Sequence, residues 1–302
     1  MSSFDNLEFA EPVRKKFQHN WLLNISLFFL TLIATTLMGT FWVGNLKPYV
    51  NLKELIIQIT AIHTILNGLM FSLPLLFILL AHEMGHYLAC RKYRVDATLP
   101  FFIPVPFGVG TLGAFIKIKE PFPSKRILFD VGVAGPIAGF IASIPFAIVG
   151  IWTTKIVQFA PQEGDVFMQD PILFKILIYL KFGTLNNETM VLNPFIFASW
   201  IGILATMLNL LPFGQLDGGH IIYSLFGKWQ RKIVFPLYLI LLILGIYWLG
   251  WFLWAIIIIL MNPFHPRLWD EALPIDRKRK IIGIVVFVIF ILSFMPVPVR
   301  VY

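Results

Sequence analysis

Charged side chains are scarce in this sequence. Lys, Arg, Asp and Glu make up 13% of the 302 residues, about half of the share of roughly 25% that soluble domains carry. Hydrophobic residues make up 58%, and the mean hydropathy is +0.81. This imbalance excludes an ordinary soluble globule. It predicts an all-α polytopic membrane protein with about six to seven transmembrane helices, for which the lipid bilayer is a partner.

Cysteine is almost absent. The single Cys90 excludes an internal disulfide and a thiolate-rich metal site, so a bound metal would need nitrogen and oxygen ligands. The formal net charge of +8 arises from short basic clusters between apolar runs, and the sequence carries no nucleic-acid motif. We therefore expect no nucleic-acid partner.

Seven apolar runs supply the predicted spans. The first follows three basic residues and is longer than a signal-peptide core, which predicts a retained signal anchor. If successive runs alternate across the bilayer, 18 of the 24 Lys and Arg lie on one side. The positive-inside rule makes that side cytoplasmic, together with the N terminus, and we expect the cell (inner) membrane. The runs cover residues 21–43, 66–90, 127–152, 193–211, 233–249, 251–262 and 281–295.

Two intervals between the runs have a distinct composition. The segment from Thr98 to Pro123 is apolar but rich in proline and glycine, which argues against a helix. Unpaired backbone cannot face lipid, so we predict a short re-entrant β segment buried against protein or a wet cavity. Its part from Val109 to Ile118 could pair with a peptide by strand addition. The predicted substrate-binding residues are Gly110, Thr111, Leu112 and Gly113. The polar interval 153–192 is expected to be an outer loop with a short amphipathic segment.

The second apolar run ends in the sequence His82-Glu83-Met84-Gly85-His86. On a helix, residues four apart share a face, so His82 and His86 can bind one zinc ion while Glu83 stands beside them as a base. A catalytic zinc usually takes three protein ligands and leaves one position for water. Asp217 is the predicted third ligand, because it follows the fourth apolar run on the same side of the membrane and needs a charged partner there.

The residues around Asp217 predict a broken helix. Pro212 and nearby glycines interrupt the apolar run, so that polar backbone can face a hydrated cavity. His220, one turn beyond Asp217, is an alternative ligand, whereas His265 has no partner in the sequence.

Two other classes of function are open at this point. A transporter or ion carrier could use intramembrane His, Glu and Asp as a coupling site, although the sequence lacks the duplicated halves of many such folds. A catalytically inactive scaffold could bind membrane helices without cutting them. The intact Glu83 argues against the scaffold, which has no need of an activated water.

The two motifs together resemble the site-2 protease family of intramembrane zinc metalloproteases. HEMGH at 82–86 is similar to the zinc motif of that family, and NLLPFGQLDGGH at 209–220 is similar to its Asn-x-x-Pro-x-x-x-x-Asp-Gly element. The resemblance implies an endopeptidase that cuts within or beside the transmembrane helix of a protein substrate, which unwinds for cleavage. It implies one zinc ion per chain with His82, His86 and Asp217 as ligands, Glu83 as catalytic base, and Asn209 as a donor to the oxyanion.

The resemblance covers about residues 66–226, including the extended GVGTLGA stretch and the element from Gly135 to Gly139. These two glycines also have a packing explanation, since small residues four apart let helices approach closely. Asn209 can equally satisfy loose backbone groups at a broken helix end. The predicted division is a cytoplasmic N-terminal segment 1–20, a signal anchor and outer loop 21–65, a catalytic membrane core 66–226 around three helices, and C-terminal spans 227–302.

Overall fold

The computed structural model describes residues 17, 19–44, 46, 51–158, 163–185, 188–266, 268 and 274–301, and most of these are helical. The predicted N-terminal segment 1–20 lies almost entirely outside the described residues. The helices are α1 (Trp21–Val43), α2 (Leu52–Thr60), α3 (Ile62–Lys92), α4 (Lys125–Thr153), α5 (Ile172–Phe182), α6 (Pro194–Asn209), α7 (Asp217–Phe226), the short 3-10 helix η1 (Gly227–Trp229), α8 (Gln230–Tyr247), α9 (Gly250–Leu260) and α10 (Arg277–Ser293). The strands are β1 (Phe101–Pro104), β2 (Thr111–Phe115), β3 (Ile156–Gln158), β4 (Val166–Met168), β5 (Glu188–Met190) and β6 (Val299–Val301).

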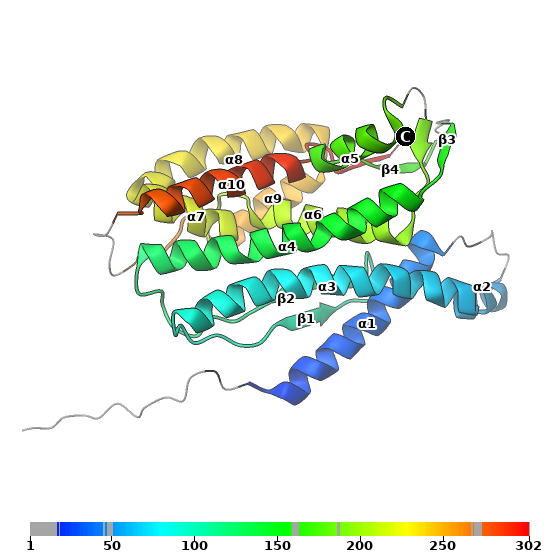
Figure 1. Ribbon diagram of the computed structural model, residues 1–302, viewed down its shortest axis with the longest axis horizontal. Coiled ribbons are helices and arrows are strands. Elements are labelled where there is room, and N and C mark those ends of the chain that lie inside the picture. Colours follow the sequence, from blue (N-terminus) through cyan, green and yellow to red (C-terminus); the bar gives the residue numbers. More distant parts are fainter. Residues whose placement is uncertain are drawn as a thin grey trace, which may run out of the picture.

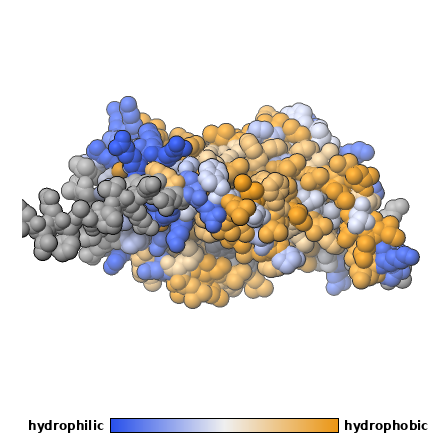
Figure 2. Space-filling model, turned by 90° about the horizontal axis from the view of Figure 1, so that it is seen from below, coloured by the Kyte–Doolittle hydropathy of each residue, from blue (hydrophilic) through white to orange (hydrophobic). Residues whose placement is uncertain are grey.

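Within the described ranges, four helical segments are long and apolar enough to cross a membrane. They are α1, α3, α4 and the continuous segment Asp217–Tyr247 that joins α7 to α8, while α6 and α9 are shorter apolar helices. On the face shown in Figure 2, apolar side chains form a broad band between hydrophilic ends. These features confirm a mostly helical integral membrane protein with a few short strands.

The centre of the bundle consists of α3, α4 and α6 (Figure 1). Side chains of Ser124 and Asn193 cap the starts of α4 and α6 by accepting from backbone N–H groups in the first turn. Gly85 lets α3 and α4 approach closely, since a Cβ atom there would lie 2.4 Å from the Ala134 carbonyl oxygen. α1 crosses the other side of α3, and α8 and α10 lie beyond α4 (Figure 1).

The basic ends of the helices gather at one end of the bundle. The last turn of α3 and the starts of α4, α8 and α10 all lie at the left in Figure 1. Arg279 of α10 donates from Nε to Asp130 Oδ1 of α4 at 2.8 Å. Tyr93, just after α3, donates its hydroxyl to the same carboxylate. This grouping agrees with the predicted alternation of the apolar runs.

β1 and β2 form an antiparallel hairpin beside α1 and α3 (Figure 1), with Phe102 opposite Ala114. Gly110 precedes β2 with a φ of +88°, and a Cβ atom on it would lie 2.5 Å from Thr35 Cα, so the turn can rest on α1 only with glycine here. The prediction of extended chain between the second and third runs is therefore confirmed.

The opposite end of the bundle carries structure that the sequence did not predict. The interval 153–192, expected to be an outer loop with a short amphipathic segment, contains α5 and also the strands β3, β4 and β5. β3 pairs with β5, and β4 pairs with β6 near the C terminus. Strands of three residues are too short to show a period, and Val166 pairs with Val301, a residue far along the chain. Only tertiary contacts could reveal these pairs.

Candidate metal centre

Two histidines of α3 and the first residue of α7 converge on one point. The Nε2 atoms of His82 and His86 lie 3.2 Å apart. Asp217 Oδ2 is 3.2 Å from His82 Nε2, and Asp217 Oδ1 is 3.3 Å from His86 Nε2. Both histidines are buried, with 5% and 8% of their surfaces exposed. The structure thus brings together the three predicted ligands from distant parts of the chain.

This set of atoms fits a zinc ion. Zinc binds histidine nitrogen and carboxylate oxygen at about 2.0–2.2 Å in a tetrahedral arrangement, which separates neighbouring ligand atoms by about 3.3–3.5 Å. The observed separations of 3.2 and 3.3 Å agree with that spacing. In the part of the chain that the structure describes, these three residues form the one group of His, Cys, Asp and Glu that could hold a metal ion.

Asp217 owes its position to the break in the helix. α6 ends at Asn209 and α7 begins at Asp217, as the glycines and Pro212 predicted. Gly218 and Gly219 let the first turn of α7 pack against the backbone of the break, because Cβ atoms there would lie 2.0 Å from Leu210 O and 2.4 Å from Gly214 O. A larger residue at either position would move Asp217 away from the histidines.

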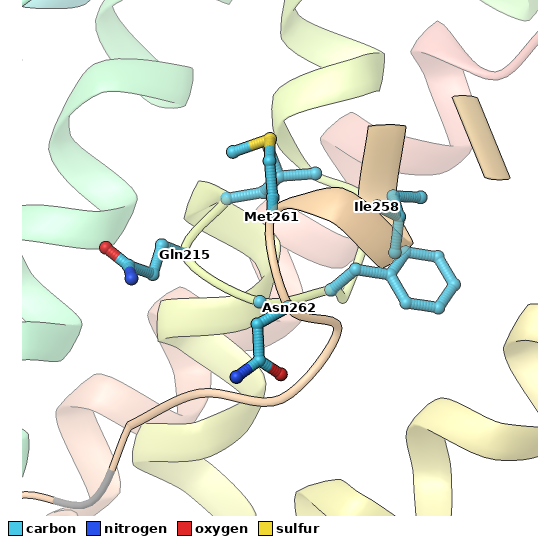
Figure 3. Close-up of a pocket in the computed structure, with 7 residues that line it drawn as sticks. Gln215, Ile258, Met261 and Asn262 are labelled. Atoms are coloured by element: carbon cyan, nitrogen blue, oxygen red, sulfur yellow. The ribbon is translucent and has the colours of Figure 1, made fainter. Parts of the chain in front are cut away.

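The end of α9 contacts the same turn. Figure 3 shows Ile258, Met261 and Asn262 gathered against the segment that carries Gln215, whose own side chain points away from them. Gly214 donates its N–H to Pro263 O at 2.9 Å. The void between the two segments measures about 10 Å³, close to the minimum of roughly 10–15 Å³ for one water molecule. The α9 end therefore supports the turn directly.

A backbone carbonyl of α4 orients His86. His86 Nδ1 lies 2.8 Å from Val131 O, and a carbonyl oxygen can only accept, so Nδ1 carries the proton. The lone pair is then on Nε2, the atom that faces His82 and Asp217. Metal-binding histidines are usually held by such a second hydrogen bond.

Two glycines of α4 leave the space that the imidazole rings occupy. A Cβ atom on Gly135 would lie 2.0 Å from His86 Nε2, and one on Gly139 would lie 3.0 Å from His82 Nδ1. These glycines were expected to let helices pack closely. In the structure they let α4 pack against the rings of His82 and His86, the two candidate ligands. The sequence signal was present in the Gly135 to Gly139 element, but it did not say what packs there.

Gly135→Ala is expected to weaken zinc binding at least tenfold, because the new methyl group must displace the His86 ring, and changes next to a ligand typically cost 10- to 100-fold in metal affinity. Zinc per purified chain, titrated against a competing chelator, measures the effect. Gly283→Ala is a matched control, since its Cβ would meet Leu225 Cδ1 at an ordinary 3.4 Å. Equal zinc affinity in both variants would contradict the role given to Gly135.

Glu83 lies next to His82 in α3 and is held by the β2 segment. Its Oε2 accepts the backbone N–H of Ile116, the residue after β2, at 2.9 Å. Glu83 is 8% exposed. One carboxylate oxygen is thus held by the residue that follows β2.

The free edge of β2 faces Glu83, the neighbour of His82 in α3. On the β1 side, Thr98 donates its N–H to Lys117 O at 3.0 Å, and Lys117 donates its N–H to Thr98 Oγ1 at 2.9 Å. Backbone groups of successive residues in a strand point to opposite edges, so Ile116 points to the other edge, where Glu83 accepts its N–H. Within the described ranges, this hairpin has only two strands, and β2 pairs with no other strand on that edge.

Asn209 and the 110–113 segment differ in how closely they approach the cluster. Asn209 Nδ2 lies 3.5 Å from His82 Nε2, so the last residue of α6 reaches the site. Thr111 is buried and donates its hydroxyl to Ile103 O at 2.9 Å, which stabilises the hairpin itself. Gly110 packs on α1, whereas Leu112 is 65% exposed. The predicted substrate-binding residues therefore occupy different environments.

His220 is not among the converging atoms. Its Nδ1 lies 2.8 Å from His265 Nε2, and His265 Nδ1 lies 2.6 Å from Pro266 O. The carbonyl must accept from His265 Nδ1, so His220 Nδ1 donates to His265 Nε2. Burial lowers the pKa of His265, outside the apolar helices, and favours this neutral form. This pair joins α7 to the loop after α9, and nothing in the sequence indicated it.

Comparison with known proteins identifies the family. The family model described as "Peptidase family M50" matches residues 70–247, more than half of the chain and both motifs of the site. The chain belongs to peptidase family M50. This membership confirms the resemblance to site-2 proteases and zinc as the predicted metal, and it gives no support to the transporter alternative.

Relatives of this M50 chain carry corresponding names. It is 30% identical over 240 residues to "Probable zinc metalloprotease EGY1, chloroplastic" of Arabidopsis thaliana, covering 75% of this chain and 43% of that protein. The EGY1 protein of Oryza sativa subsp. japonica is 34% identical over 167 residues, which is 54% of this chain and 29% of that protein. The EGY2 protein of Arabidopsis thaliana is 28% identical over 247 residues, with 77% and 42% covered. The chain spans less than half the length of these relatives.

Proposed function

We propose that this chain is an intramembrane zinc endopeptidase that cleaves a peptide bond within or beside a transmembrane helix of a protein substrate. The observation that carries the proposal is the convergence of His82, His86 and Asp217 beside Glu83 inside a bundle of apolar helices. Family membership and the names of the relatives support metallopeptidase chemistry.

Each polar residue of the site has a chemical role in this proposal. His82, His86 and Asp217 would hold one zinc ion, which would act as a Lewis acid and make a water molecule easier to deprotonate. Glu83 accepts a proton from the attacking water and delivers it to the leaving amine. Asn209 donates from Nδ2 to the carbonyl oxygen of the scissile bond as it gains negative charge.

The depth of the site suits a substrate within the bilayer. His82 lies ten residues before the end of α3 at Lys92, which at 1.5 Å per residue is about 15 Å from the basic end. His86 lies about 9 Å from the same end. A substrate bond at this depth belongs to a transmembrane segment, and the polar break between Asn209 and Asp217 gives water a path along protein rather than lipid.

The substrate helix must unwind before water can attack, because its carbonyl groups are otherwise hydrogen-bonded within the helix. The free edge of β2 offers new partners for the unwound segment by strand addition. The hydrogen bond from Ile116 to Glu83 supports this proposal, because it joins this edge to the residue that we propose as the base. We assign Gly110 and Thr111 to forming the hairpin, and Leu112 and Gly113 to contact with the substrate.

Ala114→Pro is expected to lower kcat/KM about tenfold, because proline removes the N–H that Ala114 presents on the same edge as Ile116, and one such hydrogen bond contributes up to about 1.5 kcal/mol. Zinc content should stay unchanged. Ala114→Ser keeps the N–H and serves as the control. Full activity of the proline variant, with normal zinc, would remove strand addition from the mechanism.

The membrane arrangement extends the proposal. We assign α1, α3, α4, α6, α8 and α10 as spans, with the 11-residue α9 a partial seventh, and we retain the division into residues 1–20, 21–65, 66–226 and 227–302. The N terminus and the basic end of the bundle face the cytoplasm of the cell (inner) membrane by the positive-inside rule. The active site then opens toward the cytoplasmic side.

A panel of synthetic transmembrane peptides in nanodiscs tests the function. We expect the purified chain to cut some of them within the apolar segment, and cleavage to stop with a zinc chelator and return with added zinc. Mass spectrometry locates the cut bonds. Cleavage that persists after complete zinc removal, or cuts confined to soluble flanks, would reject the proposed activity.

A further inference from the structure

A large cavity lies on the far side of the bundle from α1. It is lined by α7, α8 and α10 and by the segment Leu210 to Phe213, and its volume is about 740 Å³. The cavity lies between α10, which packs on α4, α5 and α6, and α8, which packs on α7 and α9, and Trp251 of α9 also contributes to its lining (Figure 1). The proposed zinc site does not use this space.

The cavity is long and apolar. Along α10 it extends from Lys280 to Phe294, fourteen residues or about 21 Å, which exceeds the ~15 Å depth of one hydrocarbon leaflet. Lys280 is the one charged residue in its lining, and the indole N–H of Trp251 is already donated to Pro296 O at 2.7 Å. The walls therefore offer almost no hydrogen-bond partners.

The apolar walls argue against an extended peptide as the occupant. An extended peptide would bring N–H and C=O groups that the apolar walls cannot satisfy. A hydrocarbon chain has no such groups.

The cytoplasmic end of the cavity carries positive charge. Lys280 lines the opening, whereas the exposed Lys278 lies outside the lining. Arg279 is engaged by Asp130 and Asp276. Among the described residues, no ion pair involves Lys280, which leaves its ammonium group for an anion at the level where lipid headgroups lie.

We propose that this cavity binds an acyl chain of an anionic membrane lipid whose headgroup pairs with Lys280. The lipid would contact Leu210 and Leu211, which belong to the turn between Asn209 and Asp217, and Gly218 in the first turn of α7. Its chain would fill the space behind that turn and support it from the side opposite the histidines.

Native mass spectrometry of the full chain with phosphatidylglycerol or phosphatidylcholine of identical acyl chains tests this directly. Ile240→Trp fills the cavity, and Ile243→Trp is its control, since Ile243 is similarly exposed on α8 but lies outside the lining. Lys280→Gln is paired with Lys278→Gln in the same way. Zinc content and elution volume verify folding, and Gly283→Leu replaces Ile240→Trp if that variant does not fold.

We expect wild type to retain phosphatidylglycerol in preference to phosphatidylcholine. Ile240→Trp should lower the retention of phosphatidylglycerol at least fivefold, and Lys280→Gln should lower it about fivefold. Both control variants should match wild type. Equal retention in all variants would show lipid bound only around the perimeter and would overturn the proposal. Equal retention of both lipids would overturn the anionic headgroup. If a peptide copurified with the wild type and Ile240→Trp displaced that peptide rather than lipid, the occupant would not be an acyl chain. None of these readouts depends on peptidase activity.

Discussion

Glu83→Gln is expected to lower the rate of peptide cleavage by about 10²–10⁴-fold while zinc remains bound. Glutamine cannot accept a proton from the attacking water, so the chemical step loses its base. Its amide oxygen can still accept the N–H of Ile116, so the β2 edge should keep its position. Cleavage of the peptide panel and zinc per chain, measured on the same preparation, give the two quantities.

A matched control uses the same chemical change at the other end of the bundle. Glu188→Gln in β5 is expected to cleave as wild type does. Retained cleavage in Glu83→Gln would remove Glu83 from the role of base. If wild type and Glu83→Gln were equally inactive on every peptide while both held zinc, the inactive scaffold would become the leading alternative.

Asp217→Ala is expected to remove zinc almost completely and cleavage with it. Two neutral imidazoles would remain, and a catalytic zinc site usually needs a third protein ligand. The free energy of unfolding should also lose its zinc dependence, because metal that binds only the folded state stabilises it by mass action. Elemental analysis and thermal unfolding with and without added zinc measure both effects.

Asp165→Ala, a change of the same kind at an exposed position, serves as the control and should retain one zinc per chain. A full zinc content in Asp217→Ala would reject Asp217 as a ligand. His220 would then be the next candidate for the third ligand. His265→Ala would test that candidate, because His220 Nδ1 donates to His265 Nε2 and this contact holds the His220 ring in the present structure.

Much of the architecture followed from local patterns. Each apolar run contains one helix, because burial of apolar side chains in lipid requires long segments with internal hydrogen bonds. The strand near residues 111–115 was predictable because proline and glycine exclude a helix there. The motif spacing alone put His82 and His86 on one face of α3, and a metal needed a third ligand that only a few intramembrane acids could supply.

Other features depend on contacts between segments far apart in sequence. The pairing of β4 with β6 and the His220–His265 contact had no local signal, since neither partner predicts the other. The contact between Glu83 and Ile116 was equally hidden, because it depends on where the free edge of β2 lies relative to α3.

The sequence by itself determined that the chain belongs in a membrane, that its chemistry uses nitrogen and oxygen ligands, and which residues can supply them, because composition and helical spacing act locally. Tertiary structure decided how those residues meet. Gly135 makes room for the His86 ring, Gly218 and Gly219 seat Asp217 against a broken helix, and α8 and α10 enclose a cavity. Such outcomes depend on close packing between surfaces, which no single segment specifies.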